Sequence, residues 1–184
     1  MIITVSGKIA SGKSVAARHI AGEYGFEYLS PGKIMRDMAA EKDMDVNEFS
    51  KIAESTPKID KEIDSRQKKI TSQGDWVVDG RLSPHMLNAD ARIWLTAPIK
   101  ERAKRIMGRE ARFTDMEAAI ESISQREKSE QLRYKKYYGI DVEDQSIYDI
   151  ILDTGILDIQ EMKMEIIRRL DSKLKKSRLL SSLD

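Results

Sequence analysis

The sequence contains no cysteine among its 184 residues. Disulfide bonds and thiolate metal sites are therefore excluded, and a reducing cytoplasm is the expected compartment. Histidine is scarce too, since His19 and His85 are the only two and lie far apart. Two distant histidines give no metal-ligand spacing, so we expect each to be an ordinary surface or core residue rather than a catalyst.

Long apolar segments and a strong charge of one sign are also missing. No run approaches the roughly 18 residues of a membrane span, and the N-terminus starts on a predicted strand, without a signal-peptide pattern. The formal net charge is only +1, which gives no support to a broad basic surface for nucleic acid. We therefore expect a monomer with small-molecule partners, and neither a membrane nor a nucleic-acid partner.

The most informative stretch is residues 7–14, which fit the pattern G-x-x-x-x-G-K-[ST]. An apolar run at 2–5 precedes it and a helical pattern from Val15 follows, so backbone N–H groups are expected to surround phosphates. Lys13 would reach the β/γ-phosphates, and the Ser14 hydroxyl would ligate Mg²⁺. The predicted nucleotide-binding residues are Gly7, Lys8, Ile9, Ala10, Ser11, Gly12, Lys13, Ser14 and Val15. The chain is thus expected to bind a nucleoside triphosphate.

Five β-rich runs alternate with helical patterns, at residues 2–5, 26–29, 76–78, 93–95 and 150–152. This alternation predicts an α/β fold, in which a five-stranded parallel sheet carries helices on both faces. With a phosphate loop after the first strand, it is the P-loop NTPase fold. Ligands of such sheets gather at the carboxyl ends of the strands, which directs attention to Ser30, Asp79, Gly80 and Arg81.

Two connections are too long for a single crossover helix. Residues 32–74 should hold helices at about 32–42, 45–54 and 58–72, forming a movable cap over a second substrate. Residues 108–134 should form a lid, because a break around 111–114 separates two helical patterns and residues 100–136 carry eleven Lys and Arg against seven acids. A last helix is predicted at 160–174, with a frayed tail at 175–184. The chain 1–184 is thus expected to be one domain with two insertions.

Arginines are available on both sides of the expected cleft. Phosphoryl transfer depends on positioning and charge neutralisation, and a phosphate acceptor needs no general base because it is mostly dianionic at pH 7. Arg36 and Arg81 can face the acceptor. Arg126, Glu130 and Arg133 fall at i, i+4 and i+7, which places them on one face of the lid helix, although such spacing is also common on solvated helices.

Asp79 closes the third predicted strand and precedes Gly80. A carboxylate there can hold a Mg²⁺-bound water or orient a substrate, and Gly80 lets the backbone pass close to a ligand. Capping of the following turn is the structural alternative for Asp79.

Together these motifs resemble those of the nucleoside monophosphate kinases, and most closely the archaeal-type cytidylate kinases. The resemblance covers about residues 1–172. Beside the phosphate loop, it rests on S-x-G-x-I-x-R at 30–36, Asp-Gly-Arg at 79–81 and Arg-x₃-Glu-x₂-Arg at 126–133. It implies phosphoryl transfer from ATP, with Mg²⁺, to CMP or dCMP, and it makes residues 32–74 the monophosphate-binding insertion.

The resemblance also implies a role for each matching residue. Arg36, Arg81 and Arg133 would bind the acceptor phosphate, whereas Arg126 and Glu130 would contact the acceptor ribose. Ser30 would lie near that ribose, and Arg109 resembles the lid arginine that stacks on the donor adenine. The implied catalytic residues are Lys13, Asp79, Arg126 and Arg133.

Two positions depart from the bacterial branch of this family. Leu82 stands where an acid follows Asp-Gly-Arg, and Asp60 stands where the cap carries a base-reading arginine. Cytosine offers an amino donor at N4 and acceptors at N3 and O2, so a carboxylate with an amide or cationic donor would distinguish it from uracil. The cap residues of suitable chemistry are Asp60, Asp64, Arg66 and Gln67, although exposed helix charges would explain them equally well.

Other functions stay open on the sequence. A kinase for AMP, UMP or a small hydroxylated metabolite would use the same loop, and a hydroxyl acceptor would need Asp79 as its base. A P-loop NTPase switch is a different class of protein. It is disfavoured because the guanine-reading motif N-K-x-D is absent from the sequence.

Overall fold

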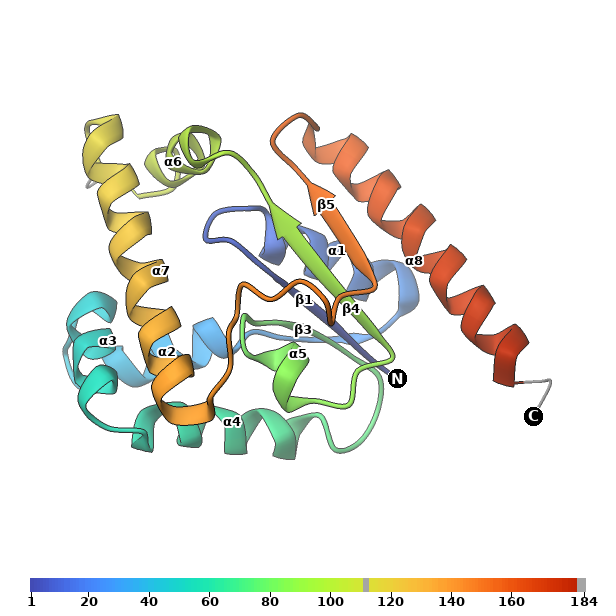
Figure 1. The fold of residues 1–184 in the computed structure, drawn as a ribbon, viewed down its shortest axis with the longest axis horizontal. Helices are drawn as coiled ribbons and strands as arrows, with labels where there is room; N and C mark the ends of the chain where they lie inside the picture. The colour runs from blue at the N-terminus through green and yellow to red at the C-terminus, as the bar shows by residue number, and fades with distance from the viewer. Residues whose placement is uncertain (111–112, 182–184) are drawn as a thin grey trace.

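The structure is a computed structural model and describes residues 1–110 and 113–181. Its centre is a five-stranded sheet (Figure 1) in the order β2-β3-β1-β4-β5. The strands are β1 (Ile2–Gly7), β2 (Glu27–Leu29), β3 (Trp76–Asp79), β4 (Ala91–Thr96) and β5 (Ile150–Asp153). Every neighbouring pair is parallel, which confirms the predicted fold class and places all five carboxyl ends at one edge.

Eight helices connect or follow the strands in the described residues. They are α1 (Lys13–Tyr24), α2 (Pro31–Ala40), α3 (Val46–Ser55), α4 (Lys58–Ile70), α5 (Ser83–Met86), α6 (Ile99–Met107), α7 (Met116–Tyr138) and α8 (Ile159–Ser181). None of the described helices combines the length and apolarity needed to cross a membrane.

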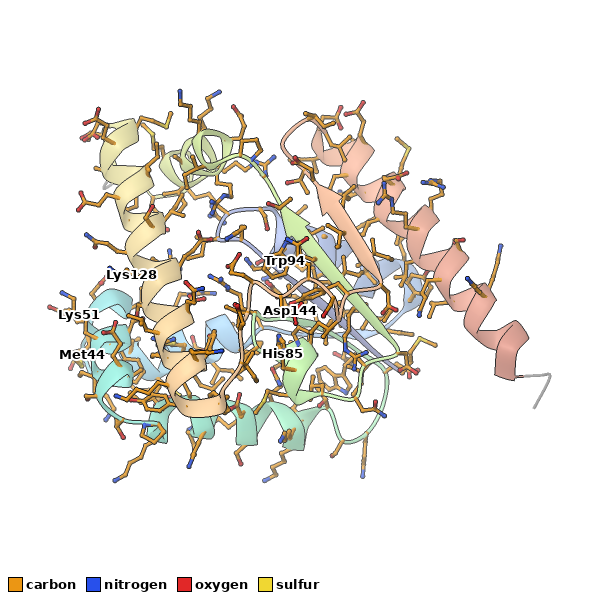
Figure 2. The ribbon with its side chains drawn as sticks, in the orientation of Figure 1. Met44, Lys51, His85, Trp94, Lys128 and Asp144 are labelled. Atoms are coloured by element: carbon orange, nitrogen blue, oxygen red, sulfur yellow. The ribbon has the colours of Figure 1, made fainter. Side chains whose placement is uncertain are left out.

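The main core lies between the sheet and helices α1 and α8. Ile3 and Val5 of β1 and Ile93 of β4 pack there against Ile20 and Ile166, and all five are fully buried. Trp94, labelled in Figure 2, follows Ile93 on β4 and so projects to the opposite face. The centre of its ring lies 5.1 Å from that of Tyr148. The alternation of buried side chains along β4 therefore gives both faces of the sheet an apolar layer.

The two long connections carry their own apolar clusters. Helices α2, α3 and α4 pack around Phe49, Ala53 and Ile63, and α6 packs on α7 around Ile106 and Ile123. Figure 1 shows α7 standing between α3 and α6. The predicted helices at 32–42, 45–54 and 58–72 thus correspond to α2, α3 and α4. Of the predicted break at 111–114, residues 111–112 lie outside the described residues.

One predicted bound was wrong and one helix was not predicted. Helix α8 was expected to end at 174 with a frayed tail, but it runs to Ser181, and 182–184 lie outside the described residues. No Gly or Pro interrupts residues 160–181, and Lys, Leu and Arg favour helix, so nothing local stops it. The four-residue helix α5 was missed, because Pro84 at its start is also common in ordinary turns.

Candidate active site

The loop between β1 and α1 is shaped around glycine. Gly7 has φ +133°, and a Cβ at this position would lie 1.9 Å from the carbonyl oxygen of Leu95, so no other residue fits. The Lys13 ammonium donates to the carbonyl oxygens of Gly7 at 3.2 Å and of Lys8 at 2.7 Å. Burial lowers the Lys13 pKa to about 8, and the nearby Asp79 carboxylate opposes that shift. A cation therefore stands at the mouth of the loop.

Ser14 and Asp79 place two oxygen ligands side by side next to this loop. The Ser14 hydroxyl donates to Asp79 Oδ2 at 2.5 Å, and the Tyr28 hydroxyl donates to the same oxygen at 3.2 Å. Among the described residues, no group of three or more His, Asp or Glu is placed to hold a metal ion by protein ligands alone. One hydroxyl and one carboxylate fit Mg²⁺, which keeps several waters and takes phosphate oxygens as further ligands.

Arginines of α6 support the phosphate loop from behind. Arg102, with 6% of its surface exposed, donates to the carbonyl oxygens of Ala97 at 3.0 Å and Ile9 at 3.1 Å. Arg105 donates to the Thr154 hydroxyl at 2.9 Å, and this hydroxyl donates to the Ser11 carbonyl oxygen at 2.8 Å. The Ile9 and Ser11 carbonyl oxygens of the loop are thereby paired within the protein.

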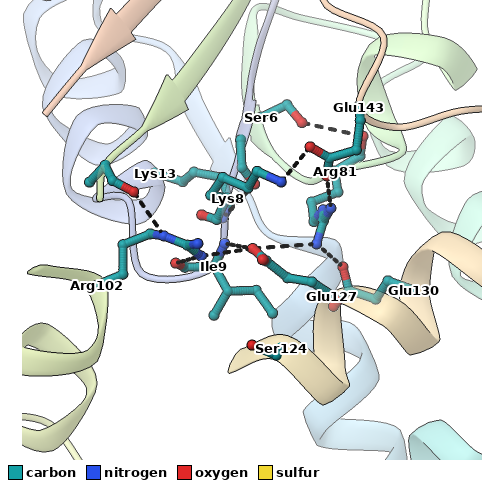
Figure 3. A network of polar contacts seen from close by, with 12 residues as sticks. Ser6, Lys8, Ile9, Lys13, Arg81, Arg102, Ser124, Glu127, Glu130 and Glu143 are labelled. Carbon is teal, nitrogen blue, oxygen red and sulfur yellow. Dashed lines mark hydrogen bonds and ion pairs between the residues drawn. The ribbon is translucent and has the colours of Figure 1, made fainter. Parts of the chain in front are cut away.

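Glu127 joins the phosphate loop to α7. Its Oε1 accepts from the backbone N–H of Ile9 at 2.8 Å and from Arg102 Nη1 at 2.9 Å (Figure 3). The carboxylate thus connects three segments that are far apart in the sequence. The position of α7 over the loop is fixed by this contact.

Arg81, which follows β3, is surrounded by carboxylates. Only 6% of it is exposed, and its guanidinium lies 3.1 Å from Glu130, 3.0 Å from Glu143 and 4.0 Å from Glu127. Figure 3 shows Glu130 and Glu143 meeting it from two sides, and Lys8 also pairs with Glu143. These acids hold the guanidinium at the cavity, and an anionic ligand would have to exchange with one of them.

A cavity of 390 Å³ brings most of the predicted site residues together. From the predicted set, it is lined by Ile9, Ala10, Lys13, Ser14, Ser30, Arg36, Asp60, Asp64, Asp79, Gly80, Arg81, Arg109, Arg126, Glu130 and Arg133. A second cavity of 320 Å³ adjoins the other side of the loop, and Ala10, Ser11, Gly12, Val15 and Arg109 line it. Because Ala10 and Arg109 line both, the two cavities meet at the phosphate loop.

Several predicted residues have a structural partner or face elsewhere. Ser30 caps α2, since its side chain accepts from the Lys33 backbone N–H. Arg66 points away from the cavity and pairs with Glu62 at 2.7 Å, so its inclusion in a base-binding set was wrong. A helix of 3.6 residues per turn turns Arg66 away from the face of Asp60, Asp64 and Gln67. His19 and His85 do not line the site cavity.

The face of α4 that lines the cavity is polar although it is buried. Asp60, 4% exposed, lies with its Oδ2 3.3 Å from Nε of Arg133, 2% exposed. Burial raises the Asp60 pKa to about 6, and Arg133 opposes that shift. The Tyr138 hydroxyl donates to Asp64, whose pKa is also raised by burial. This end of the cavity therefore presents carboxylate acceptors that are already held in place.

Sequence reasoning missed four polar residues of this site: Arg102, Glu127, Tyr138 and Glu143. Arg102 belongs to the Lys- and Arg-rich stretch at 100–136 and Glu127 adjoins Arg126, so both had a signal in the sequence. Tyr138 and Glu143 pair with Asp64 and Arg81 across 74 and 62 positions. Such distant pairs leave no periodic signal in the sequence.

Solved structures share the fold at low sequence identity. A gluconokinase from Sinorhizobium meliloti superposes with a TM-score of 0.65 at 13% identity, covering 97% of this chain and 96% of that one. A shikimate kinase from Acinetobacter baumannii, in complex with shikimate, gives 0.57 at 14%, covering 93% of each chain. These similarities establish a P-loop kinase fold.

Relatives found by sequence share a much higher identity with this chain than these solved structures do. Cytidylate kinase of Thermococcus kodakarensis is 46% identical over 156 residues, 84% of this chain and 80% of the relative. Cytidylate kinase of Methanocella arvoryzae is 42% identical over 178 residues, 96% of this chain and 100% of the relative. The model of the cytidylate kinase-like family matches residues 2–156. The chain therefore belongs to the cytidylate kinase-like family.

Proposed function

We propose that the protein transfers the γ-phosphoryl group of ATP to CMP or dCMP, giving ADP and CDP or dCDP. One observation carries this proposal: a single cavity joins the phosphate-loop residues Lys13 and Ser14 to a second set of arginines and to the polar face of α4. A hydrolytic NTPase has no use for a second polar compartment beside its phosphate loop. A kinase needs it for the acceptor.

The donor would occupy the phosphate loop and the second cavity. Backbone N–H groups at residues 10 and 12–14, together with the Lys13 ammonium, would hold the phosphates. The adenine would lie near Arg109 and Thr154. The Ser14 hydroxyl and the Asp79 carboxylate would hold Mg²⁺, which neutralises charge on the β- and γ-phosphates.

The acceptor would bind with its phosphate among the arginines of the site. An oxygen of the CMP phosphate attacks the γ-phosphorus and forms a new P–O bond, while the bond to the β,γ-bridging oxygen breaks and its electron pair leaves with ADP. Lys13, Arg126 and Arg133 would neutralise the transferring group, with Arg36 and Arg81 on the acceptor phosphate. No general base is needed, so Asp79 serves the metal ion.

We further propose that the protein acts on small molecules as a monomer. A net charge of +1 and the absence of cysteine agree with a cytoplasmic enzyme that does not bind nucleic acid. Sedimentation velocity with and without nucleotides would test the monomer.

The test of the function is an ADP-release assay with ATP and Mg²⁺ and a panel of CMP, dCMP, UMP, AMP, GMP and dTMP. Selective turnover of CMP or dCMP is the expected result. Preference for AMP or UMP would keep the kinase and overturn the cytidylate assignment. ATP hydrolysis without transfer to any of the six would overturn the kinase itself.

A further inference from the structure

Gln67 of α4 is a buried amide that phosphate chemistry leaves unused. Only 2% of it is exposed, and it lines the site cavity together with Asp60 and Asp64. The Ser83 hydroxyl of α5 donates to Gln67 Oε1 at 2.7 Å, whereas Nε2 has no hydrogen-bond partner among the described residues. A buried amide nitrogen without an acceptor is unfavourable, which indicates that a ligand supplies the acceptor.

Ser83 determines which end of the amide faces the ligand. Ser83 is 1% exposed, so its hydroxyl proton needs a protein acceptor, and Gln67 Oε1 provides one. The amide is then held with Nε2 directed away from Ser83. Gly80 permits this arrangement, because a Cβ there would lie 2.2 Å from Ser83 Oγ.

The groups around Gln67 complete a compartment for a flat polar ring. Asp60, Asp64 and Gln67 follow one another at i, i+4 and i+7 and share one face of α4. Met35, Ile63 and Leu82 add apolar wall to the same cavity. A planar heterocycle with both donors and acceptors on one edge matches these surroundings.

We propose that Gln67 and the α4 carboxylates distinguish cytosine from uracil, an inference that rests on the proposed function. Gln67 Nε2 donates to N3 of cytosine, and Asp60 or Asp64 accepts from its N4 amino group. Uracil presents an N3–H donor and an O4 acceptor. Its N3–H would face the Nε2 donor of Gln67, and its O4 would face an α4 carboxylate, so both contacts would be repulsive. Gln67 is thus a specificity-determining residue, and Ser83 is a positioning residue that acts through it.

The experiment compares kcat/KM for CMP and UMP, at saturating ATP, in Gln67→Glu, Ser83→Ala and Thr71→Val. In Gln67→Glu, the introduced carboxylate would accept where the amide donates, so the CMP-to-UMP ratio should fall about 10- to 100-fold, mostly through KM for CMP. Ser83→Ala removes the hydrogen bond that fixes the orientation of the Gln67 amide, so the CMP-to-UMP ratio of kcat/KM should fall by a smaller factor. Thr71→Val is the control, since its buried hydroxyl donates only to the Gln67 backbone carbonyl oxygen at 3.0 Å and lies outside the cavity.

Thermal unfolding and KM for ATP are measured on each variant, so that a folding defect is recognised. If Gln67→Glu does not fold, the comparison of Ser83→Ala with Thr71→Val decides alone. Ratios within twofold of wild type for both site variants would overturn the inference, as would a shift in Thr71→Val equal to that in Ser83→Ala. A wild type without preference for CMP over UMP would overturn the proposed cytidylate function as well, so the two failures are distinct.

Discussion

Lys13 ties activity to pH through its lowered pKa. Because burial lowers that pKa to about 8, the ammonium is mostly charged at pH 7 and loses its proton as pH rises through 8. Since kcat/KM reports the free enzyme, kcat/KM for ATP should fall above pH 8.

Lys13→Arg is the matched control, because a guanidinium keeps its charge throughout this range. The variant should be slower at pH 7 but should lack the fall above pH 8. An unchanged fall in Lys13→Arg would assign the titration to another group.

Arg36 is assigned to the acceptor and not to ATP. Replacing it by alanine should raise KM for CMP by about 10-fold or more, because an anion loses a charge-assisted contact, while KM for ATP changes little. Lys33→Ala is the control on the same helix, since Lys33 is exposed and pairs with Asp37. Equal effects of Arg36→Ala on both substrates would contradict the assignment.

Gly7 is the position where the addition of a single methyl group should prevent the phosphate loop from adopting its conformation. In Gly7→Ala, the Cβ would collide with the backbone of Leu95, so we expect loss of ATP binding and a large fall in melting temperature. Gly22→Ala is the control, because no atom lies within 4 Å of its Cβ and φ is ordinary. That change should stabilise the protein by about 0.5–1 kcal/mol.

At the scale of elements, Glu127 connects α6, α7 and the phosphate loop. Glu127→Ala would leave Arg102 without its carboxylate and Ile9 without an acceptor. Arg102 is buried, and leaving a buried donor without its acceptor costs about 1–3 kcal/mol. Urea unfolding should show this loss, with a raised KM for ATP, whereas Lys128→Ala, at the exposed neighbouring position, should change neither.

Helices and strands could be predicted from the sequence better than the side-chain contacts between them. The five strands and the helices α2, α3 and α4 followed from apolar periodicity and turn residues, which are local signals. Helix α5 and the extent of α8 were not predicted, since one is shorter than a period and the other has no stop signal. The direction of a side chain within a helix could be foreseen where spacing decides it, as for Arg126, Glu130 and Arg133, which all line the cavity.

The partners of charged residues could not be foreseen in this way. Arg81 was expected to bind the acceptor phosphate, and nothing in the sequence indicated the three carboxylates that approach it. Arg133 was expected to bind phosphate, and it is paired with Asp60. Charges can pair across any sequence separation, so only the fold determines which acid meets which arginine.

At the scale of the whole molecule, the separate apolar clusters of α2–α4 and of α6–α7 suit closure around two substrates. Adding CMP with a non-hydrolysable ATP analogue should slow amide hydrogen exchange in α2, α3, α4 and α7. The part of α8 around Leu170, which packs on the main core and lies away from the second cavity, should show no change. Equal protection by either nucleotide alone would argue against joint closure.

The shared carboxylate of Glu127 has an evolutionary consequence. A change at Arg102 alone leaves a partly buried acid without its cation. A change at Glu127 alone leaves a buried guanidinium and a loop N–H without their acceptor. Either single step is selected against, whereas a joint exchange for two neutral partners can preserve the fold. Among relatives, positions 102 and 127 should therefore drift together, so that lineages differ at both positions or at neither.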